Sequence, residues 1–135
     1  MKLEKIWAIY FSGTGTTRRT VERIAGGIAS RLNLPAESVD FSRPAVRQET
    51  LGFGEMDLVV FGTPVYAGRV PVLLRDEFAH LEGRGTPAVV VGLYGNRAFD
   101  DALLEAADLL EERGFNVTAA GAFIGEHSLT ARVGT

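Results

Sequence analysis

The sequence predicts an α/β domain in which a parallel β-sheet is covered by helices on both faces. Two observations lead to this prediction. Apolar runs of strand length alternate with longer segments that repeat apolar residues at helical spacing, from residue 5 to residue 124. Most of these runs are nearly continuous rather than alternating with polar residues, as expected for strands that are buried on both faces.

The chain has the size and composition of one domain, which we assign to residues 1–135. It is 46% apolar and 23% charged, which is enough to build a core. The net charge of −3 provides no basic footprint for nucleic acid, and no apolar run approaches the roughly 18–20 residues that span a bilayer. The first residues lead into a strand pattern without a signal-peptide cleavage site, so we expect a cytoplasmic protein.

The absence of cysteine removes several classes of function. The chain cannot form a disulfide framework, a cysteine zinc site or an iron–sulfur cluster, and it cannot be a thiol-dependent enzyme. Its two histidines, His80 and His127, are far apart in sequence. A histidine metal site is therefore not expected.

In the first half of the chain we expect a strand at residues 5–11, a helix at 16–32 and a short strand at 38–41. The helix carries an apolar stripe at i, i+3, i+4, i+7, i+8 and i+11: Val21, Ile24, Ala25, Ile28, Ala29 and Leu32. The pair Gly26-Gly27 weakens this helix, and we interpret it as a place of close packing on the sheet. Residues 44–54 predict a loop with at most a short helix.

In the second half we expect strands at residues 58–62, 88–93 and 117–124. Helices are predicted at 70–80, with Pro71 acceptable in the first turn, and at 99–113. Gly114 follows this last helix where a residue in the left-handed conformation commonly ends a helix.

The loops after the strands at 5–11, 58–62 and 88–93 are the candidate ligand site. In open α/β sheets, ligands bind beyond the carboxyl ends of the strands, where the strand order reverses. The first loop is dense in glycines and hydroxyls: Ser12, Gly13, Thr14, Gly15, Thr16 and Thr17. Glycines let the backbone approach a phosphate, and the N–H groups at the start of the helix can bind it. The loop lacks the lysine of a Walker motif, and Arg18 stands where a dinucleotide fingerprint needs glycine. A tight turn with a helix cap is the simpler alternative.

The first loop resembles the S/T-x-T-G-x-T motif with which flavodoxins grip the phosphate of FMN. This resemblance extends over essentially the whole chain. It implies a doubly wound five-stranded parallel sheet in the order 2-1-3-4-5 and a non-covalently bound FMN. The sequence around Tyr94-Gly95-Asn96-Arg97 is most similar to flavodoxin-like domains of anaerobes that are fused to ferredoxin domains.

The resemblance also implies roles for the other two loops. The loop after 58–62 provides the cofactor-binding candidates Thr63, Pro64, Val65, Tyr66, Ala67 and Gly68, and the loop after 88–93 provides Tyr94, Gly95, Asn96 and Arg97. Tyr66 matches the aromatic residue that stacks on the flavin ring, although it could instead cap the sheet. Tyr94 contacts the flavin or points into the core, and Asn96 contacts the flavin edge or stabilises its own turn.

Some residues depart from the flavodoxin pattern. Arg18, Arg19 and Arg69 are cations where low-potential flavodoxins have acidic or neutral loops. His127 lies past the last strand on the ligand side, where a surface role is the more ordinary interpretation.

Two function classes follow, with a third as a plain alternative. The leading hypothesis is an electron carrier that docks with redox partner proteins, such as a ferredoxin or a ferredoxin domain. The second is an FMN-dependent NAD(P)H or quinone oxidoreductase, in which Arg69 and Arg97 receive an anionic substrate. The third is a binding module that has lost the flavin. A response regulator is disfavoured, because no phosphoacceptor aspartate ends the strand at 58–62.

The last helix of the flavodoxin fold is expected to be missing. Only residues 125–135 follow the last strand, and they offer no apolar stripe. That strand has apolar or small residues on both faces, which we assign as Val117, Ala119 and Phe123 on one and Ala120, Ala122 and Ile124 on the other. One face is left open. We therefore expect self-association as a homodimer, or a fragment of a longer protein.

Overall fold

The computed structural model describes residues 2–10, 15–40, 50–65, 80–94 and 102–124. Within these ranges the chain forms seven strands and two helices, and the helices follow the first and the sixth strand. In chain order they are β1 Lys5–Tyr10, α1 Gly15–Leu32, β2 Ala36–Asp40, β3 Leu51–Gly52, β4 Asp57–Val65, β5 Leu81–Glu82, β6 Thr86–Tyr94, α4 Ala102–Glu112 and β7 Phe115–Ile124.

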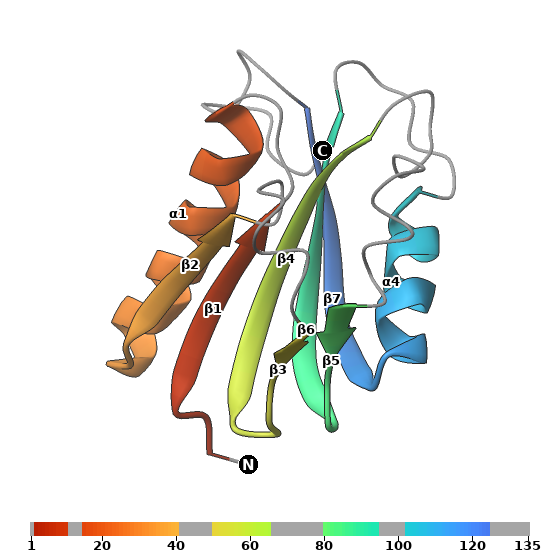
Figure 1. The fold of residues 1–135 in the computed structure, drawn as a ribbon. Coiled ribbons are helices and arrows are strands. Elements are labelled where there is room, and N and C mark those ends of the chain that lie inside the picture. The colour runs from red at the N-terminus through yellow and green to blue at the C-terminus, as the bar shows by residue number, and fades with distance from the viewer. Residues whose placement is uncertain (1, 11–14, 41–49, 66–79, 95–101, 125–135) are drawn as a thin grey trace.

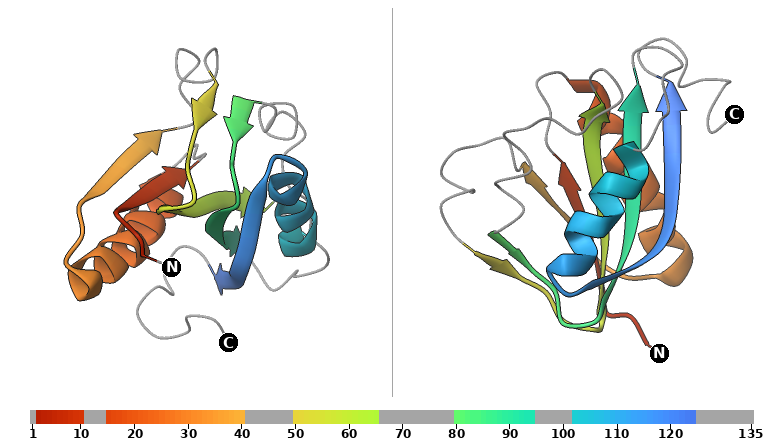
Figure 2. Two further views of the ribbon diagram at one scale, coloured as in Figure 1. Left: turned by 90° about the horizontal axis from the view of Figure 1, so that it is seen from below. Right: turned by 90° about the vertical axis from the view of Figure 1, so that its right-hand side faces the viewer.

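The five long strands form one parallel sheet in the order β2-β1-β4-β6-β7 (Figure 1). Counting only these strands, this is the order 2-1-3-4-5, so the predicted topology is confirmed. Helix α1 covers one face of the sheet and α4 covers the other (Figure 2). The sheet therefore forms the middle layer of the molecule.

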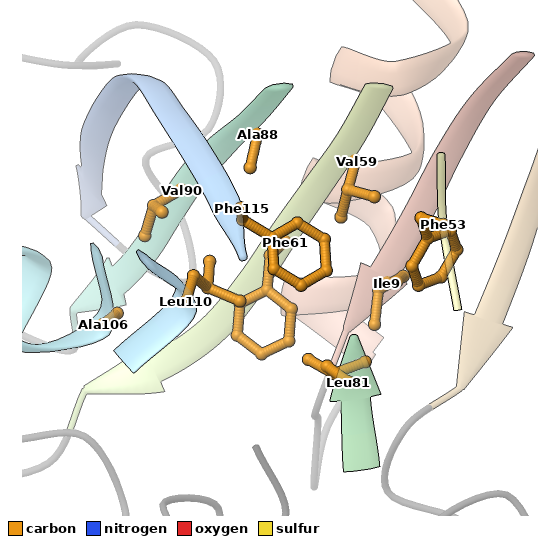
Figure 3. Packing of buried hydrophobic residues seen from close by; sticks show 10 residues of the cluster. All are labelled: Ile9, Phe53, Val59, Phe61, Leu81, Ala88, Val90, Ala106, Leu110 and Phe115. Atoms are coloured by element: carbon orange, nitrogen blue, oxygen red, sulfur yellow. The ribbon is translucent and has the colours of Figure 1, made fainter. Parts of the chain in front are cut away.

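Alternate residues of the central strands enter two separate cores. On the α4 face, Ile9, Val59 and Val90 pack with a cluster that includes Phe61, Leu110 and Phe115 (Figure 3). On the α1 face, the neighbouring positions Ala8, Val60 and Val91 pack against α1. This two-sided burial explains why the strands read as continuous apolar runs.

Helix α1 packs on the sheet through the predicted stripe. Val21, Ala25 and Ala29 are buried, while Leu32 at the end of the stripe is 49% exposed. The interpretation of Gly26-Gly27 as a close-packing site is wrong. Both glycines are exposed, and a Cβ added to either would meet no heavy atom within 4 Å. They weaken the helix by about 1 kcal/mol each relative to alanine, and the described fold gives no packing reason for them.

One prediction about the middle of the chain needs correction, and a second falls outside the described residues. Residues 51 and 52, predicted as loop or helix, form β3, which pairs in parallel with β5 through Leu51↔Leu81 and Gly52↔Glu82. Phe53 then enters the α4-side core, and its N–H donates to the Glu82 carbonyl at 2.9 Å. The predicted helix at 70–80 lies outside the described residues except for His80, which immediately precedes β5.

Strand β7 contains a bulge that changes which side chains share a face. Val117 lies opposite Ala88, but Ala119 lies opposite Val89, so Thr118 is an extra residue. The Thr118 hydroxyl donates to the Ala88 carbonyl at 3.2 Å. Val117 consequently packs in the α4-side core while Phe123 packs in the α1-side core. The predicted grouping of Val117 with Ala119 and Phe123 is therefore wrong.

The amino ends of the strands are closed by side-chain contacts around Trp7. Its indole N–H donates to Asp57 Oδ1 at 3.2 Å, and the ring meets Phe53 edge-on with centroids 5.3 Å apart. The ammonium of Lys5 lies 4.2 Å from the centroid of the indole ring and also pairs with Glu37. These contacts link β1, β2 and β4 at the end of the sheet opposite the predicted ligand loops.

The turn after α4 is locked at the same end. Gly114 has φ +97°, as predicted for the residue that ends this helix, and a Cβ there would overlap the Gly83 carbonyl. The N–H of Gly83 donates to the Arg113 carbonyl at 2.8 Å, and the N–H of Gly85 donates to the Gly114 carbonyl at 2.9 Å. The α4–β7 turn is therefore tied to the β5–β6 turn.

Candidate ligand site at the carboxyl edge of the sheet

The strand order reverses between β1 and β4. From β1 the chain runs through α1 to β2 on one side, whereas β4, β6 and β7 follow in order on the other side. The chain therefore leaves the carboxyl ends of β1 and β4 in opposite directions. This is the position where open α/β sheets bind their ligands.

The N-terminal part of α1 lies against the end of β4 because Gly62 has no side chain. A Cβ on Gly62 would overlap Cγ2 of Val21 and would lie 3.3 Å from Cγ2 of Thr17. Thr17 is 2% exposed and Val21 is fully buried, so this contact is tightly packed. Gly62 thus fixes the first turns of α1 at the point of strand reversal.

The strands β4 and β6 continue past β1 at this edge. Tyr10, the last residue of β1, lies opposite Gly62, but β4 runs on to Val65, which lies opposite Tyr94 of β6. Thr63, Pro64 and Val65 were predicted as loop and are strand instead. Pro64 lacks an N–H, and among the described residues it has a strand partner on one side only, Leu93 of β6, which is the setting in which a strand tolerates proline.

The charges around the start of α1 favour an anion. The first turn holds no acidic residue, although carboxylates are the groups that stabilise a helix N-terminus. Arg18 and Arg19 are both exposed here. Arg18 is bound by Glu22 one turn later, with Nε and Oε2 3.3 Å apart. Two cations at a helix N-terminus are unfavourable for the helix alone and become favourable when an anion binds between the N–H groups.

The structure brings part of the predicted cofactor-binding set to this edge. Gly15 and Thr16 begin α1, Thr17 is buried in its first turn, and Thr63 is buried with its hydroxyl donating to the Pro64 carbonyl at 3.0 Å. Val65 and Tyr94 end the two extended strands. The remaining predicted residues lie outside the described part of the chain: Ser12, Gly13, Thr14, Tyr66, Ala67, Gly68, Gly95, Asn96 and Arg97. Arg69 and His127 also lie outside it.

Gly62 is the site residue that reasoning from the sequence missed. The sequence pattern places it only at the end of the strand predicted for residues 58–62. A glycine within an apolar strand commonly marks the close approach of another segment, and this signal was available in Val59-Val60-Phe61-Gly62. The identity of the approaching segment required the structure.

Solved structures with the same arrangement are known. A flavodoxin from the domain Archaea superposes with a TM-score of 0.65 at 18% identity, covering 91% of this chain and 86% of that one. The two-electron reduced flavodoxin of Megasphaera elsdenii superposes with a TM-score of 0.64 at 17% identity, covering 93% and 90%. The chain has the flavodoxin-like fold. Oxidised Flavodoxin 1 of Bacillus cereus shares this flavodoxin-like fold, with a TM-score of 0.60 at 19% identity and coverage of 92% and 88%.

No family model and no curated protein sequence matches the chain. The flavodoxin-like fold is therefore established by structure alone, at identities of 17–19%. In the described ranges, no helix is long and apolar enough to cross a membrane. Those ranges also contain no group of three metal-ligating side chains.

Proposed function

We propose that the chain binds FMN without a covalent bond at the carboxyl edge of the sheet and carries electrons between redox partner proteins. The observation that carries this proposal is the start of α1. Its N–H groups follow the loop of residues 12–14, its first turn holds no acidic residue, and Gly62 holds the helix at the strand reversal. A phosphate fits such a position.

The residues present fit the cofactor in two respects. The backbone from Gly13 to Thr17 would bind the phosphate, and the hydroxyls of Ser12, Thr14, Thr16 and Thr17 would add donors. Beyond the ends of β4 and β6, the loops with Tyr66 and with Tyr94-Gly95-Asn96-Arg97 would enclose the ring. FMN supplies the electron-transfer chemistry when bound, and the protein orients the ring and controls its surroundings.

The proposal is tested by the visible absorption spectrum of the purified protein and by titration with FMN and riboflavin. FMN is expected to bind far more tightly, because riboflavin lacks the phosphate. Thr17→Val keeps the shape of the buried side chain and removes its hydroxyl. Since a hydrogen bond to a charged group contributes about 1.5–3 kcal/mol, this variant should lower the affinity for FMN by tenfold or more. Its affinity for riboflavin should be unchanged. Thr20→Val, at another buried threonine of α1, is the control. Equal affinities for the two flavins would contradict the assignment of the loop.

Stacking by Tyr66 makes a second prediction. Aromatic stacking contributes about 0.5–1.5 kcal/mol beyond the burial of area, and the loss of the ring also removes burial. Tyr66→Ala should therefore lower the affinity for FMN and for riboflavin by about tenfold each, unlike Thr17→Val. Fluorescence titration of both flavins would measure this, and an unchanged affinity would exclude Tyr66 from the ring site.

Carrier and enzyme differ in one measurement. A carrier exchanges electrons with a partner protein but does not turn over NAD(P)H or quinones by itself. Steady-state NAD(P)H oxidation by the purified protein would favour the oxidoreductase instead.

A further inference from the structure

The solvent-facing side of α1 carries an unusual concentration of positive charge. The helix contains four arginines and one glutamate, a net charge of +3 in a chain whose total is −3. All four arginines are exposed. The single glutamate is already bound to Arg18, and in the described part of the chain no ion pair is seen for Arg19, Arg23 or Arg31.

The exposed glycines lie on the same side of the helix. Arg19, Arg23, Gly26, Gly27 and Ser30 follow one another at i, i+4, i+7, i+8 and i+11, which is the spacing of one helix face. All five are exposed, and open space surrounds the position of a Cβ on either glycine. The face therefore combines unpaired cations with a low-relief area where another backbone can approach closely.

We infer that this face of α1 is the docking surface for an acidic partner protein, which reaches the arginines with carboxylates and packs its backbone over Gly26 and Gly27. Charge complementarity selects the partner, because the face has no free acid of its own. Such charges steer association and orient the complex. The choice of a redox protein as the partner rests on the proposed function, since α1 begins at the candidate phosphate site and Arg19, at one end of the face, lies only four residues after that beginning.

Other occupants fit the face less well. A nucleic acid or an anionic membrane carries its negative charge well beyond the area of one helix and would meet the net negative charge of the rest of the chain, whereas a protein can confine its carboxylates to the area that faces α1. A second copy offers the acidic helix α4, which carries four acidic residues and no basic one. However, α4 lies on the opposite face of the sheet (Figure 2), so an α1–α4 contact between copies would be head-to-tail and would not close a dimer.

The charge requirement is tested with a small acidic two-iron ferredoxin as the probe. Association measured by calorimetry should weaken as ionic strength rises. Arg19→Glu/Arg23→Glu should lower the affinity at low salt by tenfold or more. Lys2→Glu/Arg84→Glu makes the same change of charge at two exposed residues outside α1 and should bind within about twofold of the unmodified protein. No salt-sensitive association, equal losses in both double variants, or binding to anionic vesicles or RNA in place of the ferredoxin would overturn the inference.

The shape requirement is tested with Gly26→Ala/Gly27→Ala. This variant should raise the midpoint of thermal unfolding, because alanine favours the helix, and yet it should bind the ferredoxin several-fold more weakly. A raised midpoint with unchanged binding would show that no backbone packs over the glycines. The proposed function is tested independently of the docking surface. A protein that binds ferredoxin through Arg19 and Arg23 but does not bind FMN would support the docking surface and contradict the proposed function. A protein that binds FMN but whose affinity for ferredoxin is unchanged by Arg19→Glu/Arg23→Glu would support FMN binding and contradict the docking surface.

Discussion

Gly62 shows how one missing side chain can position a site. It lies in β4, in the middle of the sheet, and α1 packs on it through Val21 and Thr17. Any Cβ would have to displace a helix whose contacting residues are buried. The cost of this change therefore falls on the position of the start of α1 as well as on stability.

For Gly62→Ala we expect a loss of about 1–3 kcal/mol in the free energy of unfolding, because inserting a methyl group into a packed core forces shifts of this cost. The affinity for FMN should fall more than that for riboflavin, since the start of α1 moves away from β4. Gly121→Ala is the matched control: its Cβ would come no closer than 3.4 Å to the Phe123 ring, an ordinary contact. Denaturant unfolding and flavin titration measure the two effects, and equal stability losses in both variants would contradict the role of Gly62.

At the scale of elements, helix α1 contains two glycines that lower its stability without a packing role in the described structure. Gly26→Ala and Gly27→Ala should each raise the free energy of unfolding by about 1 kcal/mol, since neither position has a steric or dihedral need for glycine. Gly114→Ala should instead destabilise the protein, because φ is +97° there and the Cβ would overlap Gly83. Denaturant unfolding of the three variants checks this contrast, and a loss of stability at residue 26 or 27 would reveal a packing role.

The sequence predicts those elements whose pattern follows from burial on both faces. The runs around Ile9, Val60 and Val90 and the stripe of α1 are dictated by local spacing, so all of them appear near their expected bounds. The pairing of Leu51 with Leu81 joins residues 30 apart and leaves no periodic pattern, so β3 and β5 were missed. The bulge at Thr118 is equally invisible, because it depends on the register against Ala88 and Val89. For the site, the loop residues could be predicted from the sequence. The contact between Gly62 and α1 could not, because it depends on how the helix packs on the sheet.

At the scale of the whole molecule, the two faces of the sheet differ in the charge of the helix that packs on them and in the strands that this helix covers. The basic helix α1 and the acidic helix α4 lie on opposite faces. Among the described residues, α1 is the only helix on its face, and it lies over β1, β2 and β4. The α1 side of β7 is therefore left with Ala119 exposed and Phe123 half-buried. The edge strand itself, Phe115–Ile124, contains no charged residue.

An uncharged edge strand that the described helices leave partly uncovered favours pairing with another copy. We predict that the chain forms a dimer at tens of micromolar and that Ala119→Lys converts it to a monomer. Ala120→Lys places the same charge on the neighbouring exposed residue of the α4 face and should leave more of the dimer intact. Light scattering on a sizing column measures the mass. A monomer in the unmodified protein would refute the prediction.

Trp7 is the sole indole of the chain, and its place at the amino ends of the strands makes it an optical reporter for one pole of the molecule. A flavin at the carboxyl ends would report from the other pole, at visible wavelengths where the protein itself is transparent. A single denaturation experiment read at both colours would then distinguish loosening of the ligand loops from collapse of the sheet. If the two signals changed together, the packing of α1 on Gly62 and the turn at Gly114 would belong to one cooperative unit.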